Sequence, residues 1–505
     1  MYSSSNVRHK VLSEFVRKGD MTWKNAEDAV KSVLFGNSNH LYRLMLPGPD
    51  NMDDPETADS SSTDDEEDRL QILRGYINND ESVKYLRVYW IDMTGTPRMR
   101  AIHMDHVWDS LGNTGNITVG ITKASLGLLQ NDTIAPGVAA TGEYKIQPDF
   151  SWMKFGPREA HMTMFGEFRE QDGTPSPLCP RTTLRNAVEA AESNGLELKI
   201  GFELELVLFA RVGDELKPLD HEGHVWSSAR VMNHPVASTV IEKAVWFLRG
   251  VGVSIQQIHA ESAPGQFELI LPPASPLEAI DTLLYVREVV TNVAMAAGYR
   301  ITLHPKPFPN AAGTAAHVHM SLCSEGGDKP AVYQPFYAGV LRHLTAICAF
   351  TYSNPVSYQR LVDGCWAGGR WVAWGTQNRE TALRKIDGSH WEVKCLDGLA
   401  NMYLAVAAII HSGVMGVLNG EELVWGDCEI DPANLTDNDR FELSIEEMLP
   451  ASLPDALTAL RADVGLCERM GEELVERYVA VKHAEMRLLD KMGEEELRRW
   501  VLERY

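Results

Sequence analysis

The sequence lacks several features that would place it in common protein classes. Its 505 residues contain no run of eighteen or more apolar residues and no hydrophobic segment near the start, so neither a membrane span nor a secretory signal is indicated. The seven cysteines include no CxxC pair, which is typical of reduced thiols in a cytoplasmic compartment. There is no GxxxxGK[ST] loop and no GxGxxG after a strand, which excludes Walker and Rossmann nucleotide sites.

Positive charge is also scarce. The chain has 47 Lys and Arg against 70 Asp and Glu, a formal net charge of −23, and no basic stripe offsets this excess. Such a chain is repelled by a phosphate backbone, so we expect no nucleic-acid partner. The lack of a long apolar run leads us to expect no membrane partner. The Ser- and Arg-containing first eighteen residues leave a mitochondrial presequence open, although Glu14 and Asp20 argue against it.

The first 80 residues differ in composition from the rest and are interpreted as an N-terminal extension. Two short amphipathic candidates, Val7–Arg17 and Trp23–Leu34, precede an acidic, Ser-rich run over residues 47–68. Such a run buries too little apolar surface to order itself. We expect a solvated linker there, with charge regulation or partner docking as the alternative.

From residue 81 the pattern predicts two domains. Residues 81–170 begin with two strands around a turn at Gly95 and indicate a small β-rich domain. Residues 171–505 mix strand, hairpin and helix signals, which predicts an α+β fold with several antiparallel strands. Helices are expected at Thr182–Ser193, Leu399–Val417 and Glu472–Asp490.

The stretch Ile255–Leu271, IQQIHAESAPGQFELIL, predicts a hairpin. Pro264-Gly265 is a strong turn signal, and a hairpin centred on it places Glu261 directly opposite Glu268, with Cβ atoms about 4.5–5.5 Å apart. Facing carboxylates destabilise a sheet unless a cation offsets their repulsion. This pair therefore indicates a cation site.

Other paired polar residues fall on single faces of predicted strands. Taken one at a time, each pair is better explained as an exposed polar face or a structural pair than as a ligand set. Together with the hairpin, however, they provide five Glu and one His that could hold two hard divalent ions. The pairs are Glu203 and Glu205, His317 and His319, and Glu392 and Lys394.

The segment WGTQNRETALRKI supplies Arg379 and Arg384 after a stretch rich in Gly and aromatic residues. Guanidinium groups bind phosphoryl oxygens through two parallel hydrogen bonds. Alone, the two residues are equally well explained as surface salt-bridge partners. Beside two metal ions, they indicate phosphoryl transfer.

The ordered set of motifs over about 420 residues resembles the glutamine synthetase family. In order, the motifs are D-x-x-G in WIDMTGTPR, E-x-E in GFELELVLF, HAESAPGQFE, the K-P of HPKPFP, HVHMSL, SYQRLV, N-R-x-x-x-x-R, and E-V-K ahead of DGLANMYL. The resemblance implies an N-terminal β-grasp domain, and then a catalytic domain with a curved antiparallel sheet flanked by helices. It also implies homo-oligomers of stacked rings, dodecamers or decamers, with active sites shared between subunits.

The resemblance implies a role for each matching residue. ATP would be the co-substrate and two or three Mg²⁺ or Mn²⁺ ions the cofactors. One ion would be held by Glu205, Glu261 and Glu268, and the second by Glu203, His317 and Glu392. Arg379 and Arg384 would hold the transferring phosphate, His319 and Ser321 would lie near the nucleotide with Arg384, and Arg360, Gly313 and Lys394 would bind the acid substrate.

The chain departs from the family pattern where ammonia-using members bind ammonium. The flap position that carries a carboxylate in those members is Trp366, and their acidic F-D-G-S-S loop corresponds to VGITKAS, where Thr122 and Lys123 bring no acid. Trp366 could instead contact a larger amine, through a cation–π interaction of about 0.5–2 kcal/mol.

Two further departures concern the acid substrate. Ala312 replaces the usual Asn before Gly313, and Lys394 replaces the usual Arg, which keeps the charge but loses the planar fork. These changes leave open whether the acid is glutamate itself.

The resemblance and these departures together predict an ATP-dependent ligase. It would activate a carboxylate, γ-glutamyl phosphate being the expected intermediate, and join it to an organic amine rather than ammonia. The alternatives are a metal- and nucleotide-binding assembly protein without ligase activity, and an ordinary glutamine synthetase.

Overall fold

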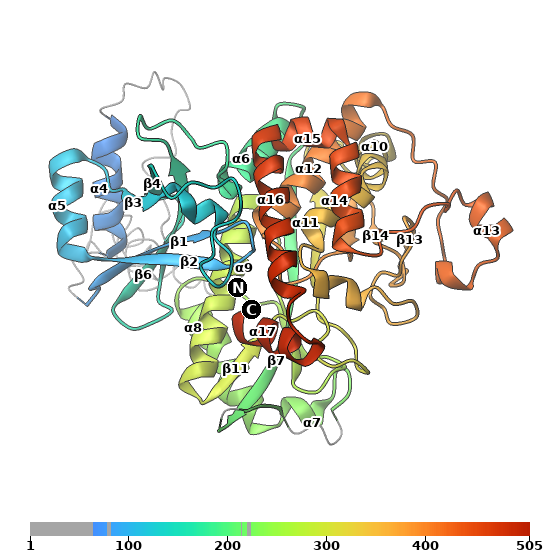
Figure 1. Ribbon diagram of the computed structural model, residues 1–505, viewed down its shortest axis with the longest axis horizontal. Helices are drawn as coiled ribbons and strands as arrows, with labels where there is room; N and C mark the ends of the chain where they lie inside the picture. Colours follow the sequence, from blue (N-terminus) through green and yellow to red (C-terminus); the bar gives the residue numbers. More distant parts are fainter. Residues whose placement is uncertain (1–63, 78–81, 214, 220–223) are drawn as a thin grey trace, which may run out of the picture.

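The computed structural model describes residues 64–77, 82–213, 215–219 and 224–505, which form two β-sheets with helices packed around them. Figure 1 shows the small sheet with its two helices on one side of the molecule and most of the later helices on the other. The amphipathic candidates before residue 47, and most of the expected linker, lie outside the described residues.

The small sheet is built from the chain between residues 85 and 169. Its order is β2-β1-β6-β4-β3, with β5 also pairing with β6. The turn at Gly95 is confirmed: its φ is +85°, and an added Cβ would lie 2.2 Å from the Leu399 carbonyl oxygen. The strands are β1 (Tyr85–Ile91), β2 (Pro97–His103), β3 (Val119–Thr122), β4 (Glu143–Pro148), β5 (Lys154–Phe155) and β6 (His161–Arg169).

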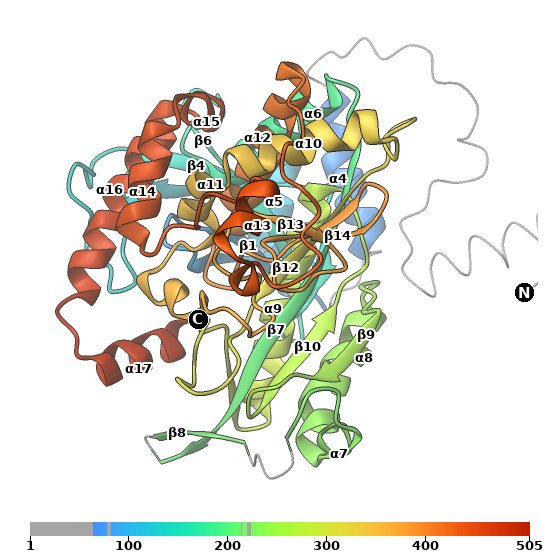
Figure 2. The same ribbon diagram turned by 90° about the vertical axis from the view of Figure 1, so that its right-hand side faces the viewer.

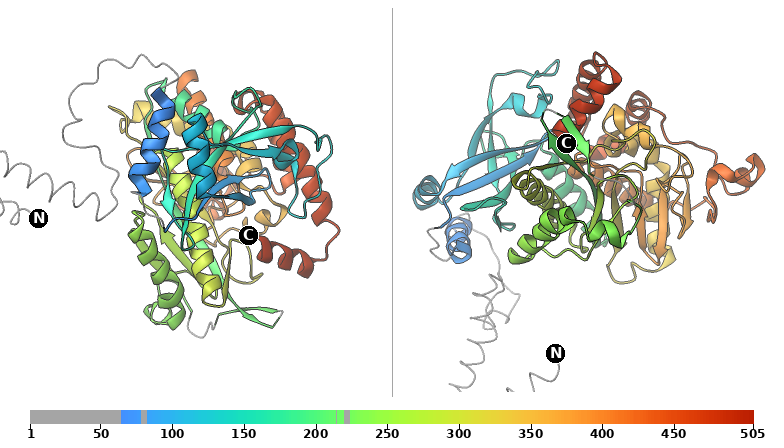
Figure 3. Two further views of the ribbon diagram at one scale, coloured as in Figure 1. Left: turned by 90° about the vertical axis from the view of Figure 1, so that its left-hand side faces the viewer. Right: turned by 90° about the horizontal axis from the view of Figure 1, so that it is seen from below.

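Two helices, α4 (Asp64–Ile77) and α5 (Met104–Thr114), lie side by side against the small sheet (Figure 3). Helix α4 begins inside the acidic run, so the linker interpretation is wrong for residues 64–68. Acidic residues are favourable in the first turn of a helix because they complement its dipole. Leu73 and Ile77 are buried in the core, so this part of the N-terminal extension is packed.

The large sheet is organised around one long strand, β7 (Leu198–Val212). Its order is β13-β14-β15-β12-β7-β10-β9, with β8 and β11 also pairing with β7, and every pair except β13–β14 is antiparallel. Figure 2 shows β7 crossing the molecule beside β10 and β9. The other strands are β8 (Glu215–Pro218), β9 (Gln257–Ala260), β10 (Gln266–Ile270), β11 (Tyr299–Thr302), β12 (Ala316–Leu322), β13 (Trp374–Thr376), β14 (Leu383–Asp387) and β15 (His390–Val393).

Helices cover the large sheet and confirm the three helix predictions with small shifts of their ends. The predicted helices correspond to α6, α12 and α16. The full set after the small sheet is α6 (Pro180–Glu192), α7 (Ala229–Met232), α8 (Lys243–Gly250), α9 (Pro276–Ala296), α10 (Pro330–Arg342), α11 (Leu344–Thr351), α12 (Met402–Asn419), α13 (Asp437–Glu442), α14 (Leu453–Ala462), α15 (Val464–Met470), α16 (Glu472–Leu489) and α17 (Glu494–Arg504). Short turns of other helix types are η3 (Lys123–Gly127), η4 (Ala237–Glu242), η5 (Pro355–Arg360) and η6 (Pro432–Asn434).

Helix α12 is the central core helix. It is long and apolar enough to cross a membrane by composition alone, but 83% of that stretch is buried inside the protein, where α12 packs against α6 and α10. Burial on all sides explains its nearly uniform apolar sequence.

The two sheets and the helices around them confirm the mixed α and β class, whereas the β-grasp assignment and the domain boundaries at 80 and 170 stay predictions.

Candidate active site

Strand β7 places two carboxylates at the centre of the large sheet. Glu203 pairs with His317 of β12, and Glu205 pairs with Glu268 of β10. Glu205 is only 7% exposed. The exposed polar face that this strand alone suggested is present at its start, where Glu197 and Lys199 are exposed, but it is wrong for the buried Glu205.

The hairpin of β9 and β10 has a different register from the predicted one. Pro264 and Gly265 are the central residues of the turn, since the Gln266 amide donates to the Ala263 carbonyl oxygen at 3.0 Å and Gly265 has φ +72°. The ladder, however, pairs Glu268 with His259. The prediction that Glu261 directly faces Glu268 is wrong.

The side chain of Gln266 explains this register. It is fully buried, and its Oε1 accepts from the Ala263 amide at 2.9 Å, which closes a four-residue loop inside the hairpin. Its Nε2 donates to Glu205 Oε2 at 2.7 Å and to the Gly313 carbonyl oxygen at 2.9 Å. Sequence reasoning missed this residue, because a lone glutamine in a hairpin carries no distinctive pattern.

Three residues of the hairpin form the first candidate metal group. His259, Glu261 and Glu268 offer ligand atoms that all lie within 4.8 Å of one another. His259 Nε2 is 3.2 Å from Glu268 Oε1, and its Nδ1 is 3.4 Å from Glu261 Oε1. His259 was missed by the sequence analysis, although its position two residues before Glu261 puts it on the same strand face.

Electrostatics at the first group show an excess of negative charge. Burial, and then repulsion by Glu268, raise the pKa of Glu261 to about 7. The hydrogen bond with Glu268 raises the pKa of His259 to about 9. The pKa of Glu205 lies well above its usual value because the side chain is buried and faces Glu268 and Glu261. The raised pKa values of Glu205 and Glu261 thus have the same two causes, burial and the neighbouring carboxylates.

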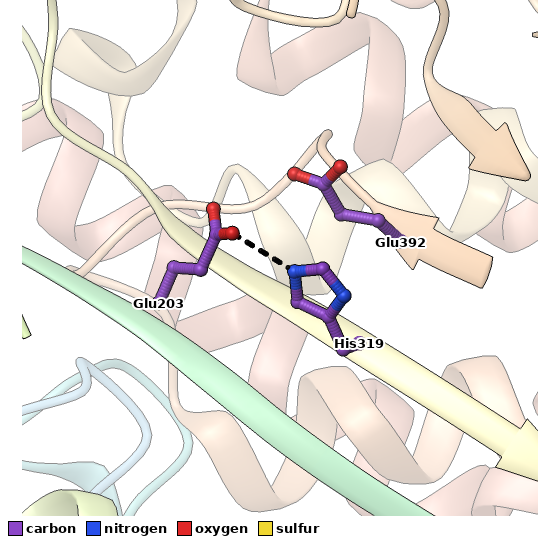
Figure 4. A group of neighbouring side chains, drawn as sticks. All are labelled: Glu203, His319 and Glu392. Atoms are coloured by element: carbon purple, nitrogen blue, oxygen red, sulfur yellow. Dashed lines mark hydrogen bonds and ion pairs between the residues drawn. The ribbon is translucent and has the colours of Figure 1, made fainter. Parts of the chain in front are cut away.

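The second candidate group joins three strands of the sheet. Glu203 of β7, His319 of β12 and Glu392 of β15 point toward one another, with His319 Nε2 3.0 Å from Glu203 Oε1 (Figure 4). His317 Nδ1 lies 2.9 Å from Glu203 Oε2 and 3.2 Å from Glu392 Oε1. His319, predicted near the nucleotide, therefore lies among the predicted metal ligands, and its Nδ1 is 2.8 Å from His390 Nε2.

Charged partners control the protonation of this second group. Although burial opposes it, the positive charge of Lys394, followed by the effect of the nearby His317, lowers the pKa of Glu392 to about 2. Burial, and then the charge of Lys394, lower the pKa of His317 to about 4, and its Nε2 is buried without a hydrogen-bond partner. A neutral imidazole with a free ring nitrogen beside two carboxylates is the state that binds a metal.

Two predicted cations lie beside Glu392. Arg384 Nη1 is 3.1 Å from Glu392 Oε2, and Lys394 Nζ is 3.1 Å from Glu392 Oε1. Arg384 also donates to Gln377. The two basic side chains therefore neutralise one carboxylate of the second group, whereas no Arg or Lys forms an ion pair with Glu261, Glu268 or Glu205 in the described part of the chain.

One cavity of about 290 Å³, here called the acidic cavity, joins most of the predicted site. Four predicted residues, Ser321, His319, Arg384 and Glu392, do not line it, and Ser321 contacts none of the other site residues through its side chain in the contacts that the structure records. The predicted residues that line it are Glu203, Glu205, Glu261, Glu268, Gly313, His317, Arg360, Trp366, Arg379 and Lys394.

Two tryptophans stand at the acidic cavity. Trp366 is 62% exposed and Trp226 is 56% exposed, and both contribute to its lining. The Trp366 amide donates to Glu380 Oε1 at 2.8 Å, which fixes the loop that carries the indole.

Arg360 also lines the acidic cavity. It is buried and donates to the Tyr352 hydroxyl and the Lys394 carbonyl oxygen, so these bonds hold its guanidinium at the cavity wall.

This donor set fits hard divalent ions. It combines buried carboxylates with imidazoles, the carboxylates repel one another, and one imidazole nitrogen lacks a partner. Carboxylate oxygens are the ligands that Mg²⁺ and Mn²⁺ prefer. With Arg360, Arg379 and Lys394 at the same cavity, candidate metal ligands and groups that can bind anions lie together.

Comparisons with known proteins agree with this class of site. The family model for the glutamine synthetase catalytic domain matches residues 177–505. The chain therefore belongs to the glutamine synthetase family, whose members are typically ATP-dependent ligases that use divalent metals.

Curated relatives carry different names. The protein fluG of Emericella nidulans is 38% identical over 98% of this chain, and the chain spans 57% of that relative's length. The gamma-glutamylpolyamine synthetase GlnA3 of Streptomyces coelicolor is 32% identical over 62% of this chain and 71% of its own length. The type-1 glutamine synthetase 1 of Dictyostelium discoideum is 29% identical over 80% of this chain and 86% of its own.

Solved structures share the fold. A glutamine synthase homolog superposes with a TM-score of 0.70 at 27% identity, covering 84% of this chain and 99% of that one. The GmaS/ADP complex superposes with a TM-score of 0.72 over 85% of this chain and 98% of that one, but at 24% identity it supports the fold alone.

Proposed function

We propose that this protein is an ATP-dependent ligase that joins a carboxylic acid, glutamate being the first candidate, to an organic amine. This proposal rests on the groups that meet at one cavity. They are paired carboxylates, the His317 imidazole with its free ring nitrogen, and basic side chains. A relative named as a gamma-glutamylpolyamine synthetase supports the choice of an organic amine.

Each residue of the candidate active site has a proposed role. Glu205, Glu261 and Glu268 hold one divalent ion, with His259 beside them, and Glu203, His317 and Glu392 hold the second. The bound ions would neutralise negative charge on the phosphates of ATP. Arg379 and Arg384 orient the transferring phosphate, His319 and Ser321 lie on the nucleotide side, and Arg360, Gly313 and Lys394 hold the acid substrate.

The proposed reaction has two steps. A carboxylate oxygen of the acid attacks the γ-phosphorus of ATP, and the bond from this phosphorus to the bridging oxygen breaks. ADP departs, and the acid is now an acyl phosphate. The amine nitrogen then attacks the acyl carbon, a C–N bond forms, inorganic phosphate leaves, and the nitrogen loses a proton. The exposed Arg379 and the half-buried Arg384 hold the phosphate during this sequence.

The entrance to the acidic cavity favours an amine with a larger body than ammonia. Trp366 and Trp226 present exposed indoles there, and Cys365 and Ala367, the neighbours of Trp366, carry no charge. Indole rings attract organic cations and contact apolar chains. We therefore assign Trp366 to amine binding.

Phosphate release from ATP tests the proposal directly. Metal-loaded protein is mixed with ATP, glutamate and a panel of amines, including ammonia, spermidine and putrescine. Amine-stimulated release is expected, with at least one organic amine faster than ammonia. Faster turnover with ammonia would identify an ordinary glutamine synthetase instead.

Hydroxylamine separates the ligase from an assembly protein without activity. An acyl phosphate formed from glutamate is trapped as a hydroxamate, whereas a protein that only binds ATP gives none. ATP binding without any hydroxamate, across several candidate acids, would overturn the proposal.

Assembly and location are proposed on family grounds. We assign the protein to the cytoplasm and to rings of identical subunits, with each active site completed by a neighbour and the β-grasp domain, residues 81–170, at that contact. Light scattering coupled to size-exclusion chromatography measures the subunit number. A monomer that is fully active would contradict shared sites.

A further inference from the structure

A second cavity, of about 390 Å³, lies away from the acidic cavity and shares no residue with it. It is bounded by the turn between β1 and β2, by α9 and β11, and by the end of the chain after α17, elements that Figure 1 shows near the centre of the molecule. Four of its lining residues are arginines: Arg211, Arg287, Arg300 and Arg504. We call it the arginine cavity.

None of these four arginines forms an ion pair with a carboxylate in the parts of the chain that the structure describes. Arg211 donates to the Gly213 carbonyl oxygen, Arg300 to the Glu503 carbonyl oxygen, and Arg504 to the Trp500 carbonyl oxygen while stacking on its ring. In a chain with a net charge of −23, four guanidinium groups without acidic partners are an unusual grouping.

Arg287 is the buried member of the set. It projects from α9 and is only 8% exposed, and its one hydrogen bond runs from Nη1 to the Gly398 carbonyl oxygen at 3.3 Å. Its Nε and Nη2 are buried without partners. Burial lowers the pKa of Arg287 to about 10, and the charge of Asp397 only partly offsets this effect. A guanidinium in this state gains most from a nearby anion.

The acidic side chains at the arginine cavity are engaged elsewhere. Glu288 accepts a hydrogen bond from the Tyr89 hydroxyl at 3.1 Å, and burial raises the pKa of its carboxyl group. Glu503 accepts from Arg499 Nε at 3.0 Å. The four arginines therefore outnumber the two acidic side chains of the lining.

The rest of the lining indicates the kind of anion. Leu284, Met295, Ile301 and Leu303 supply an apolar wall between the arginines. Apolar walls with a few placed charges are typical of sites for small organic molecules. From the unpaired arginines and this wall together, we infer that the arginine cavity binds an organic carboxylate with a short apolar chain.

Octanoate is a suitable probe, with 1-octanol as its uncharged counterpart and inorganic phosphate as a small anion without an apolar part. Isothermal titration calorimetry of the full chain at fixed ionic strength measures binding. Octanoate is expected to bind more tightly than either control, because only octanoate satisfies both the arginines and the apolar wall. Equal binding of octanol, tighter binding of phosphate, or no binding of octanoate at millimolar concentration would overturn the inference.

Variants locate the binding. Arg287→Met is expected to weaken octanoate binding about tenfold or more, because it removes the buried charge. The matched change Arg249→Met, at an exposed arginine of α8 that stacks on Trp246, should leave it unchanged. Arg211→Met, at the exposed edge of the cavity, gives a second measurement that does not touch the core, with an expected loss of about twofold to fivefold. Unchanged affinity in both cavity variants would place the octanoate elsewhere and defeat the assignment.

Discussion

The two cavities have opposite charge imbalances. In the acidic cavity, the buried Glu205 and Glu268 lie beside the half-buried Glu261, and no Arg or Lys forms an ion pair with them among the described residues. In the arginine cavity, Arg287 is buried without a carboxylate partner. The difference shows how a buried charged side chain without a partner of opposite charge indicates its ligand. Such a side chain predicts a ligand of the opposite charge. Buried pairs such as Arg181 with Asp281, at 2.7 Å, need none.

The largest expected effect is at the acidic cavity. Glu205→Gln keeps the shape but removes a charge that the proposed ion requires. ATP- and amine-dependent phosphate release should fall on the order of 100-fold or more. The control is Glu197→Gln, just before β7 and exposed, which should stay within about twofold of wild type. Equal activity of both variants would remove Glu205 from the site.

The second prediction concerns the stability of the metal-free protein as a function of pH. The pKa of Glu261 is raised from 4.5 to about 7, and that of His259 from 6.5 to about 9. At a pH between the ordinary and the raised pKa of each group, the folded state binds more protons than the unfolded state. The free energy of unfolding should therefore fall as pH rises from 5 to 9. The expected fall is about 1–3 kcal/mol, reduced from the full linkage because both side chains are partly solvated.

Urea unfolding in EDTA at several pH values measures this fall. Adding Mn²⁺ should reverse most of it at pH 8, because the ion replaces the protons. In Glu261→Gln the fall between pH 5 and 7 should become smaller, because Glu261 no longer contributes to it. A metal-free protein that becomes more stable over this range would contradict the assignment of unbalanced negative charge.

The third prediction concerns amine binding. Trp366→Ala should raise the KM for the preferred organic amine about 2- to 30-fold, the range of a cation–π contact, and leave hydroxamate formation nearly unchanged. Trp246→Ala, at an exposed tryptophan of α8, is the control. An unchanged KM in Trp366→Ala would show that this indole does not contact the amine.

The smallest expected effect concerns the stability of a variant of the arginine cavity, measured without added carboxylate ligand. Arg287→Met replaces an unpaired buried charge by an apolar side chain of similar length. The free energy of unfolding should stay the same or rise by about 1 kcal/mol. Urea unfolding measures it, and a loss of several kcal/mol would show that Arg287 has a structural partner.

The sequence indicated much of the acidic cavity because strand periodicity fixes which residues share a face. Glu203 and Glu205 were correctly placed together on β7, and the ordered motifs gave the family. The hairpin register was wrong because turn chemistry locates Pro264 and Gly265 but does not determine where the ladder resumes. That position depends on Gln266, whose partners Glu205 and Gly313 are distant in sequence.

Other features had no local signal. Arg287 is one of many charged residues on helices, and its lack of a partner emerges only when α9, β11 and the end of the chain pack together. The helix over residues 64–68 was missed because composition alone was weighed, whereas its acidic first turn and the buried Leu73 and Ile77 favour order. Long-range packing decides both cases.

The buried amide of Gln266 has a consequence for the order of events in the acidic cavity. One NH₂ group donates to a carboxylate of the proposed metal site and to the backbone of the Gly313 loop. A change in the charge state of Glu205 therefore alters the anchoring of that loop, and a shift of the loop alters Glu205. Metal loading and acid binding should be thermodynamically coupled, each tightening the other by the same factor.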